Sequence, residues 1–186
     1  GSTFWFEIDA AVARAVAHAG AGADILDLGA ESTRPGAARI SESEEIGRTV
    51  PAIREIRKVL PSIPISVDTT REKVARAALE AGADIINDIS GLTFEPGIAK
   101  AAADHDAMLV IMHMRGTPET MGSMCAYSNI LKEINDFFEE KIETAISSGV
   151  DRTKIILDPG IGFAKGYNQN LFLLRHLESF RIHSRP

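Results

Sequence analysis

Two copies of one short phrase decide the fold class of this chain: AGADILD at 21–27 and AGADIIN at 81–87. Each copy follows an alanine-rich stretch in which the larger apolar residues recur at helical spacing. A glycine directly after a helix suits the left-handed backbone that often ends one, and the aliphatic run that follows is typical of a strand. Each copy therefore predicts a helix, a turn and a strand, in that order.

The same alternation continues where the phrase is absent. Further helices are predicted over 43–60, 97–105, 130–148 and 168–177, and further strands over 64–68, 108–112 and 154–158. Short strands that are almost uniformly apolar are typical of a parallel sheet covered by helices. The chain is therefore predicted to be an α/β protein, and both a closed eight-stranded barrel and an open doubly wound sheet fit this order.

Polar residues at the strand ends favour the barrel. They are Asp27, Asp68, Asn87 with Asp88, His113 and Asp158. In a barrel these ends meet at one mouth, and the sequence lacks the glycine fingerprint of dinucleotide-binding sheets. Because such a barrel typically takes about 250 residues, we expect 3–186 to form a single, incomplete domain. It would hold about five central units of a (β/α)8 TIM barrel, with the first strand and the last two strands outside this sequence.

Composition excludes two classes of function. The chain has 186 residues, 20 of them basic and 26 acidic, and a formal net charge of −6. This balance excludes a basic nucleic-acid binder, because phosphate neutralisation needs clustered positive charge. Membrane association is not expected, since no apolar run approaches the roughly 20 residues of a membrane span. A single cysteine, Cys125, predicts a reducing compartment, so we expect a cytoplasmic protein.

Two candidate sites each allow a structural and a functional interpretation. The loop ESTRPG at 31–36 offers a hydroxyl at Thr33 and a forked cation at Arg34, which suit an anion, although a solvated turn fits equally. Asp68 ends a strand and could face a ligand. Thr69 and Glu72 could form a capping box that starts the next helix, with or without a ligand at Asp68, because the two roles are compatible.

Later strand ends offer further candidates. Asn87 and Asp88 are adjacent on a strand, so only one of them can face a barrel mouth. His113 has no Cys, Asp or Glu at metal-ligand spacing, which favours a structural histidine. DPGIGFAK at 158–165 is the most specific run, because two glycines let the backbone approach a ligand beside an acidic residue.

Five motifs together resemble those of the dihydropteroate synthase family, in the same order. They are ESTRPG at 31–36, SVDT at 66–69, INDISG at 86–91, MHMRGTP at 112–118 and DPGIGF at 158–163. The resemblance implies a pterin-binding TIM barrel. It also implies a transferase of folate biosynthesis that joins 6-hydroxymethyl-7,8-dihydropterin diphosphate to p-aminobenzoate, giving 7,8-dihydropteroate and pyrophosphate. Sulfonamides would inhibit such an enzyme.

The resemblance also assigns roles to residues. It implies that Asp158 grips the guanidine-like edge of the pterin and that Asn87 completes ring recognition. The implied apolar walls are Ile89, Met112, Gly162 and Phe163. Thr33, Arg34 and Pro35 match a loop that closes over p-aminobenzoate and pyrophosphate. Asp68 and Arg34 are the expected catalytic residues, with Asp68 stabilising the positive charge that develops on the pterin methylene.

Three family motifs have no match in this chain. The Asn-x-Thr-Pro-Asp-Ser-Phe motif of the first strand, which contributes to the magnesium and pyrophosphate site, is one of them. Mg²⁺ is therefore expected as a cofactor whose ligand lies outside this chain. The Ser-Arg-Lys and Arg-x-His motifs of the last two strands are the others. We expect little or no activity from these residues alone, and a homodimer for the parent enzyme.

Two other functions remain open at this point. One is a corrinoid-linked methyltetrahydrofolate methyltransferase, which shares the Asp and Asn grip on the pterin. The other is a non-catalytic pterin-binding homologue.

Overall fold

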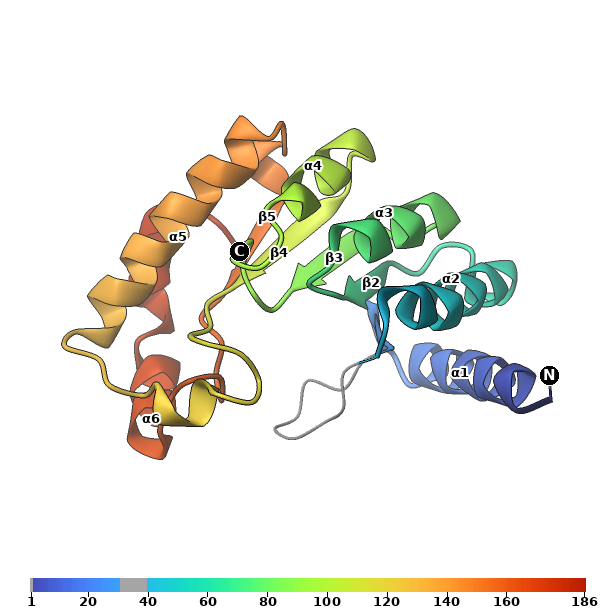
Figure 1. Ribbon diagram of the computed structural model, residues 1–186, viewed down its shortest axis with the longest axis horizontal. Coiled ribbons are helices and arrows are strands. Elements are labelled where there is room, and N and C mark those ends of the chain that lie inside the picture. Colours follow the sequence, from blue (N-terminus) through green and yellow to red (C-terminus); the bar gives the residue numbers. More distant parts are fainter. Residues whose placement is uncertain (1, 31–39) are drawn as a thin grey trace.

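The structure, a computed structural model, describes residues 2–30 and 40–186 and consists of parallel strands that alternate with helices (Figure 1). The helices are α1 (Ser2–Gly20), α2 (Glu42–Val59), α3 (Glu72–Ala81), α4 (Gly97–Asp104), α5 (Ile130–Ser147) and α6 (Tyr167–Arg175). The strands are β1 (Leu26–Gly29), β2 (Ile65–Asp68), β3 (Ile85–Asp88), β4 (Met108–Met112) and β5 (Ile155–Asp158). Short 3₁₀ turns lie at Met121–Ser123, Arg152–Lys154 and Leu177–His183.

The strand order distinguishes the two architectures that fitted the sequence. The five described strands form one parallel sheet in the order β1-β2-β3-β4-β5. A doubly wound sheet reverses its strand order at a switch point, whereas a barrel adds each unit beside the last. Consecutive helices also pack against one another along the sheet, as Figure 1 shows for α1 to α4. The described residues therefore form an arc of consecutive units of a TIM barrel, as predicted.

The main core lies between the sheet and these helices. One face of each strand presents aliphatic side chains to the helices, and the register keeps this face aligned from strand to strand, as in Leu26↔Ile65 and Val67↔Ile86. The fully buried core side chains include Ile53, Ile65, Ile86, Ile98, Leu109, Ile111, Phe138 and Leu173. Burial of this apolar face leaves the other face of the sheet available for polar groups.

Local signals explain where helices begin and end. The α2 and α5 helices are capped by Ser41 and Asn129, whose side chains accept hydrogen bonds from the backbone N–H three residues later. After α3, Gly82 has φ +111, and its N–H bonds back to the last turn of the helix. The repeated phrase is thus a helix, a turn and a strand in both copies.

The capping box that the sequence allowed at the start of α3 is not formed by Thr69 and Glu72. The N-cap is Arg71, which makes no capping bond with its side chain, and Thr69 lies two residues before it. The hydroxyl of Thr69 instead donates to Glu45 on α2 at 2.7 Å. The N–H of Glu72 donates to the carboxylate of Glu95 at 2.7 Å, so a residue from the following unit satisfies this helix end.

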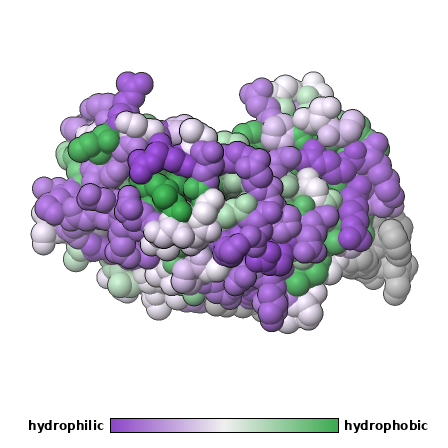
Figure 2. Space-filling view, turned by 90° about the horizontal axis from the view of Figure 1, so that it is seen from above, coloured by the Kyte–Doolittle hydropathy of each residue, from purple (hydrophilic) through white to green (hydrophobic). Residues whose placement is uncertain are grey.

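The side of the molecule that Figure 2 shows is mostly hydrophilic, with hydrophobic residues in separate patches. None of the described helices is long and apolar enough to cross a membrane.

Two adjacent leucines on α6 test the position of the core. The side chain of Leu173 is 0% exposed and that of Leu174 is 52% exposed. We expect Leu173→Ala to lower the free energy of unfolding by about 2–5 kcal/mol, because it leaves a cavity. Leu174→Ala, as the matched control, should change it by less than about 0.5 kcal/mol. Urea denaturation of the two variants measures the difference, and equal losses would contradict this packing of α6.

Candidate functional site

Polar side chains from several strands share the sheet face that the helices do not cover. Asp68 on β2 lies directly opposite Asn87 on β3, and Met112 on β4 lies directly opposite Asp158 on β5. Directly paired residues point to the same face, and so do residues two apart on one strand. Asn87 pairs with Val110, two residues before Met112, so all four side chains lie on one face at the carboxyl ends of the strands. The register therefore assembles the predicted pterin residues.

One carboxylate oxygen of Asp68 has no hydrogen-bond partner within residues 2–30 and 40–186. This atom, Oδ1, is buried. Burial, followed by the negative charges of Asp27, Asp88 and Glu45, raises the pKa of Asp68 from 3.8 to about 7. A bound cation, or a ligand that donates a hydrogen bond, would offset the cost of the unpaired buried oxygen and of the nearby negative charges.

Asn87 and Asp88 have separate tasks, as the alternation of the strand requires. Asp88 is 0% exposed, and its carboxylate accepts hydrogen bonds from the N–H and hydroxyl of Ser90 and from the N–H of Leu92, at 2.7–2.8 Å. It therefore shapes the turn after β3. Asn87 is half-buried on the open face beside Asp68.

The carboxylate of Asp158 is held by the loop that follows it. Its Oδ1 accepts a hydrogen bond from the N–H of Gly160 at 2.7 Å, and its backbone oxygen accepts one from the N–H of His113 at 2.9 Å. Gly160 has φ +70, and a Cβ atom there would collide with the carbonyl oxygen of His113. A glycine is required because this loop folds closely over the end of β4.

A second apolar cluster lies at this end of the sheet, separate from the main core. It is formed by Ile89, Met112, Met114, Met121 and Ala164, with Phe94 and Phe163 packed against it. The predicted wall residues Ile89, Met112 and Phe163 therefore come together. Gly162 is exposed at the outer part of the loop, where its N–H donates to Asn170 at 2.8 Å.

The remaining predicted site residues are Thr33, Arg34 and Pro35, which lie outside the described residues. For metals, residues 2–30 and 40–186 contain no group of three or more His, Cys, Asp and Glu side chains arranged to bind an ion.

A hollow of about 640 Å³ lies beside β1, between α1 and α2. Its lining includes Asp27 but none of Asp68, Asn87 and Asp158. We therefore place the candidate site on the open face of the sheet, where the polar groups converge.

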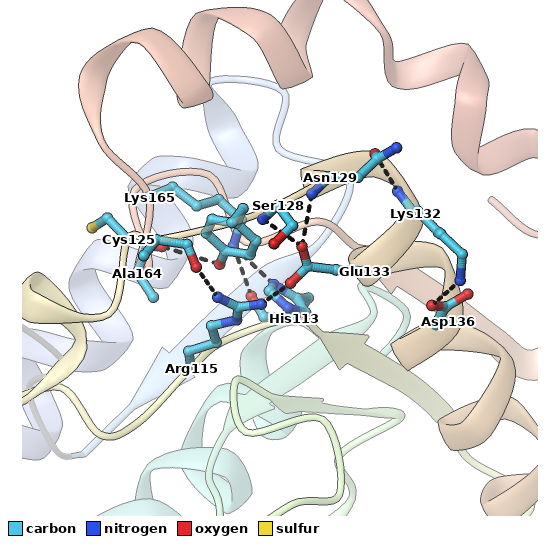
Figure 3. Close-up of polar contacts among 12 residues, drawn as sticks. His113, Arg115, Cys125, Ser128, Asn129, Lys132, Glu133, Asp136, Ala164 and Lys165 are labelled. Carbon is cyan, nitrogen blue, oxygen red and sulfur yellow. Dashed lines mark hydrogen bonds and ion pairs between the residues drawn. The ribbon is translucent and has the colours of Figure 1, made fainter.

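Sequence reasoning gave no role to the polar network beside this face. Figure 3 shows four of its members: His113 and Arg115 after β4, Glu133 on α5 and Lys165 in the loop after β5. The fifth is Tyr127, in the loop before α5, whose ring lies against Arg115. His113 accepts a hydrogen bond at Nδ1 from Lys165, as suits the predicted structural histidine. The sequence signals for the network were the motif MHMRGTP, which contains His113 and Arg115, and Lys165 at the end of DPGIGFAK.

The raised pKa of Asp68 predicts a pH-dependent cost of folding. The folded state binds this proton more tightly than the unfolded chain, so the contribution of Asp68 to stability falls as the pH rises from about 4 to about 7. Asp68→Asn should remove this part of the pH dependence. At about pH 8 the free energy of unfolding of the variant should be about 1–3 kcal/mol higher than that of the wild type. At about pH 4 it should show no such gain.

Thermal denaturation at the two pH values measures the effect. Asp24→Asn, in the exposed turn before β1, is the control and should keep the wild-type pH dependence. A gain of equal size at both pH values would show that Asp68 does not titrate as a buried carboxyl group.

Comparisons with known proteins agree with this geometry. A model of the family described as "Pterin binding enzyme" matches residues 1–185. The chain is 51% identical to a dihydropteroate synthase of Synechocystis sp. over 86% of its length and 55% of that protein. It is 47% identical to the dihydropteroate synthase of Bacillus subtilis over 86% of its length and 53% of that protein. The chain thus spans about half the length of these curated relatives.

Solved structures of dihydropteroate synthases superpose closely. The Yersinia pestis enzyme with a sulfonamide drug has a TM-score of 0.90 at 38% identity, over 96% of this chain and 64% of that one. The Xanthomonas albilineans enzyme with 4-aminobenzoic acid has a TM-score of 0.88 at 38% identity, over 96% of this chain and 63% of that one. The Anaplasma phagocytophilum enzyme with 6-hydroxymethylpterin-monophosphate has a TM-score of 0.90 at 33% identity, over 96% of this chain and 72% of that one. From the family match over nearly the whole sequence and from these similarities, the chain belongs to the pterin binding enzymes.

Proposed function

We propose that the protein containing this chain is a dihydropteroate synthase. It would condense 6-hydroxymethyl-7,8-dihydropterin diphosphate with p-aminobenzoate to give 7,8-dihydropteroate and pyrophosphate. Dihydropteroate synthases are the relatives named above, and their structures carry a pterin phosphate, 4-aminobenzoic acid or a sulfonamide. The observation that carries the proposal is the strand register, which brings Asp68, Asn87, Met112 and Asp158 to one face of the sheet.

Asp158 and Asn87 suit recognition of the pterin ring. The ring has a guanidine-like edge, and a carboxylate can accept two parallel hydrogen bonds from such an edge. The N–H of Gly160 fixes the carboxylate of Asp158 in one orientation before the ligand arrives. Met112 and Phe163, in the apolar cluster beside it, supply surfaces for the flat ring.

Asp68 suits stabilisation of the transition state. The C–O bond to the leaving pyrophosphate breaks and the C–N bond to the amine of p-aminobenzoate forms, and the amine then loses a proton to solvent. Positive charge develops on the pterin methylene as pyrophosphate departs. A carboxylate whose buried Oδ1 has no partner in the described part of the chain is attracted more strongly to this charge than to the neutral ground state, which lowers the barrier.

The proposal keeps the other expectations drawn from the resemblance. Thr33, Arg34 and Pro35 would close over p-aminobenzoate and pyrophosphate, with Arg34 balancing the charge of the leaving group. Mg²⁺ would be the cofactor, and the enzyme would be a cytoplasmic homodimer. The ligands of the metal would lie outside the described residues, which contain no group of three or more His, Cys, Asp and Glu side chains arranged to bind an ion.

The proposal is tested with the full-length protein, by following product formation from the two substrates. We expect turnover that a sulfonamide inhibits in competition with p-aminobenzoate. Asp158→Asn should reduce kcat/KM by about 100-fold or more, because an amide cannot accept both ring hydrogen bonds.

Asp151→Asn is the matched control and should retain activity, since Asp151 lies at the opposite end of β5 and its side chain accepts hydrogen bonds from the nearby Thr153. A wild-type protein that binds pterin but forms no product would instead support the non-catalytic homologue. Transfer of a methyl group from methyltetrahydrofolate to a corrinoid protein would support the methyltransferase.

A further inference from the structure

We propose that Lys165 is a positioning residue of the pterin site. Its buried ammonium group fastens the loop after β5 to the end of β4 and so holds Asp158 and Phe163 in the arrangement that receives the ring. This inference rests on the proposed function and deepens it.

The surroundings of Lys165 are unusual for a lysine. Its side chain is only 6% exposed. The ammonium nitrogen lies 3.0 Å from His113 Nδ1, 3.2 Å from the carbonyl oxygen of His113 and 2.8 Å from that of Phe163. Among the described residues, no carboxylate forms an ion pair with it. Its hydrogen-bond acceptors are neutral, and burial lowers the pKa of Lys165 to about 8 although the charge of Asp158 opposes this shift. A buried cation without an ion pair stabilises a fold poorly compared with an apolar side chain of similar size, so its presence calls for another explanation.

The acceptors of Lys165 belong to the two sides of the apolar cluster. His113 stands between Met112 and Met114, which belong to the cluster, and Phe163 packs against it from the other loop. The loop that Lys165 ties down begins with Asp158 and runs through Gly160, which already lies against the carbonyl of His113. One side chain therefore sets the spacing between the groups proposed to grip the pterin edge and those proposed to contact its faces.

The backbone around Lys165 is held at several further points. Ala164 has φ +50, a left-handed conformation that costs a non-glycine residue free energy. The hydroxyl of Tyr127 donates to the carbonyl oxygen of Ala164 at 3.1 Å. The side-chain amide of Asn170 donates to the backbone carbonyl oxygen of Lys165 at 3.2 Å. Such a conformation persists only where the surroundings enforce it.

Tyr127 is itself held in place from α5. The guanidinium of Arg115 lies 3.7 Å from the centre of the Tyr127 ring and forms an ion pair with Glu133 (Figure 3). Glu133 also accepts hydrogen bonds at 2.8 Å from the N–H groups of Ser128 and Asn129 at the start of α5. The loop after β5 is thus braced from a second direction.

The hydrogen bonds make Lys165 and His113 positioning residues rather than catalytic ones. All three N–H bonds of the ammonium have acceptors within the protein, which leaves none for a substrate. His113 must accept at Nδ1 and is therefore neutral. Burial, followed by the charges of Lys165 and Arg115, lowers its pKa to about 3.

Lys165→Met in the full-length protein is the direct test, because it keeps the length and apolar stem of the side chain and removes the three hydrogen bonds. We expect the Kd for 6-hydroxymethylpterin, measured by calorimetry, to rise about tenfold or more. The KM for the pterin diphosphate should rise in parallel, and the KM for p-aminobenzoate should change by less than about twofold. Lys154→Met is the matched control at the other end of β5, where the ammonium binds Asp106, and it should leave all three values unchanged.

His113 provides a second test that does not depend on the folding of the Lys165 variant. His113→Asn keeps an acceptor close to the position of Nδ1, whereas His113→Leu removes it. Pterin affinity should therefore be largely retained in the first variant and lost about tenfold in the second.

The inference is overturned if Lys165→Met binds pterin as the wild type does, or if both KM values rise equally. It is also overturned if His113→Asn and His113→Leu lose the same affinity. A wild-type protein that binds pterin but forms no product contradicts the proposed synthase activity alone, because the affinities still test Lys165.

Discussion

Parallel pairing of the five strands in chain order is the constraint on which the rest of the structure depends. Every second side chain of each strand points toward the helices, where the aliphatic residues of all the strands form one continuous core. The alternate residues face the other way, and the carboxyl ends of all strands lie at one edge. Asp68, Asn87 and Asp158 converge because of this geometry, without any direct contact between them having to hold the site together.

The acidic groups at this edge differ in how the protein satisfies them. Asp88 is buried, and its two oxygens accept three hydrogen bonds, so it contributes to the turn after β3. Asp68 is also largely buried, but its Oδ1 has no partner among the described residues. The first arrangement is expected of a structural residue and the second of a residue whose partner is a ligand. Folding thus leaves an electrostatic cost at Asp68 that a cationic transition state would relieve.

The loop after β5 connects the strand geometry to the proposed ligand-binding surface. The strand register fixes the backbone position of Asp158. The orientation of its carboxylate depends on Gly160 and hence on the fit of the loop over β4. Lys165 and Tyr127 hold that loop from two sides. A site on a flexible connection would lose much of its binding free energy in ordering it, whereas a braced loop presents the groups already in place.

The sequence by itself determined the α/β class, the order of the elements and the identity of the polar strand ends. These features follow from local physics: helical and strand periodicity, and glycine at helix ends, as in the agreement between the predicted helix 43–60 and α2. The five motifs also identified the family that the comparisons support. Only the tertiary structure decided that Asn87 rather than Asp88 faces the site, that Glu95 rather than Thr69 completes the start of α3, and that Lys165 bonds to His113 52 residues away. These contacts depend on register and on the packing of one unit against the next, and no spacing along the chain encodes a distance across the sheet.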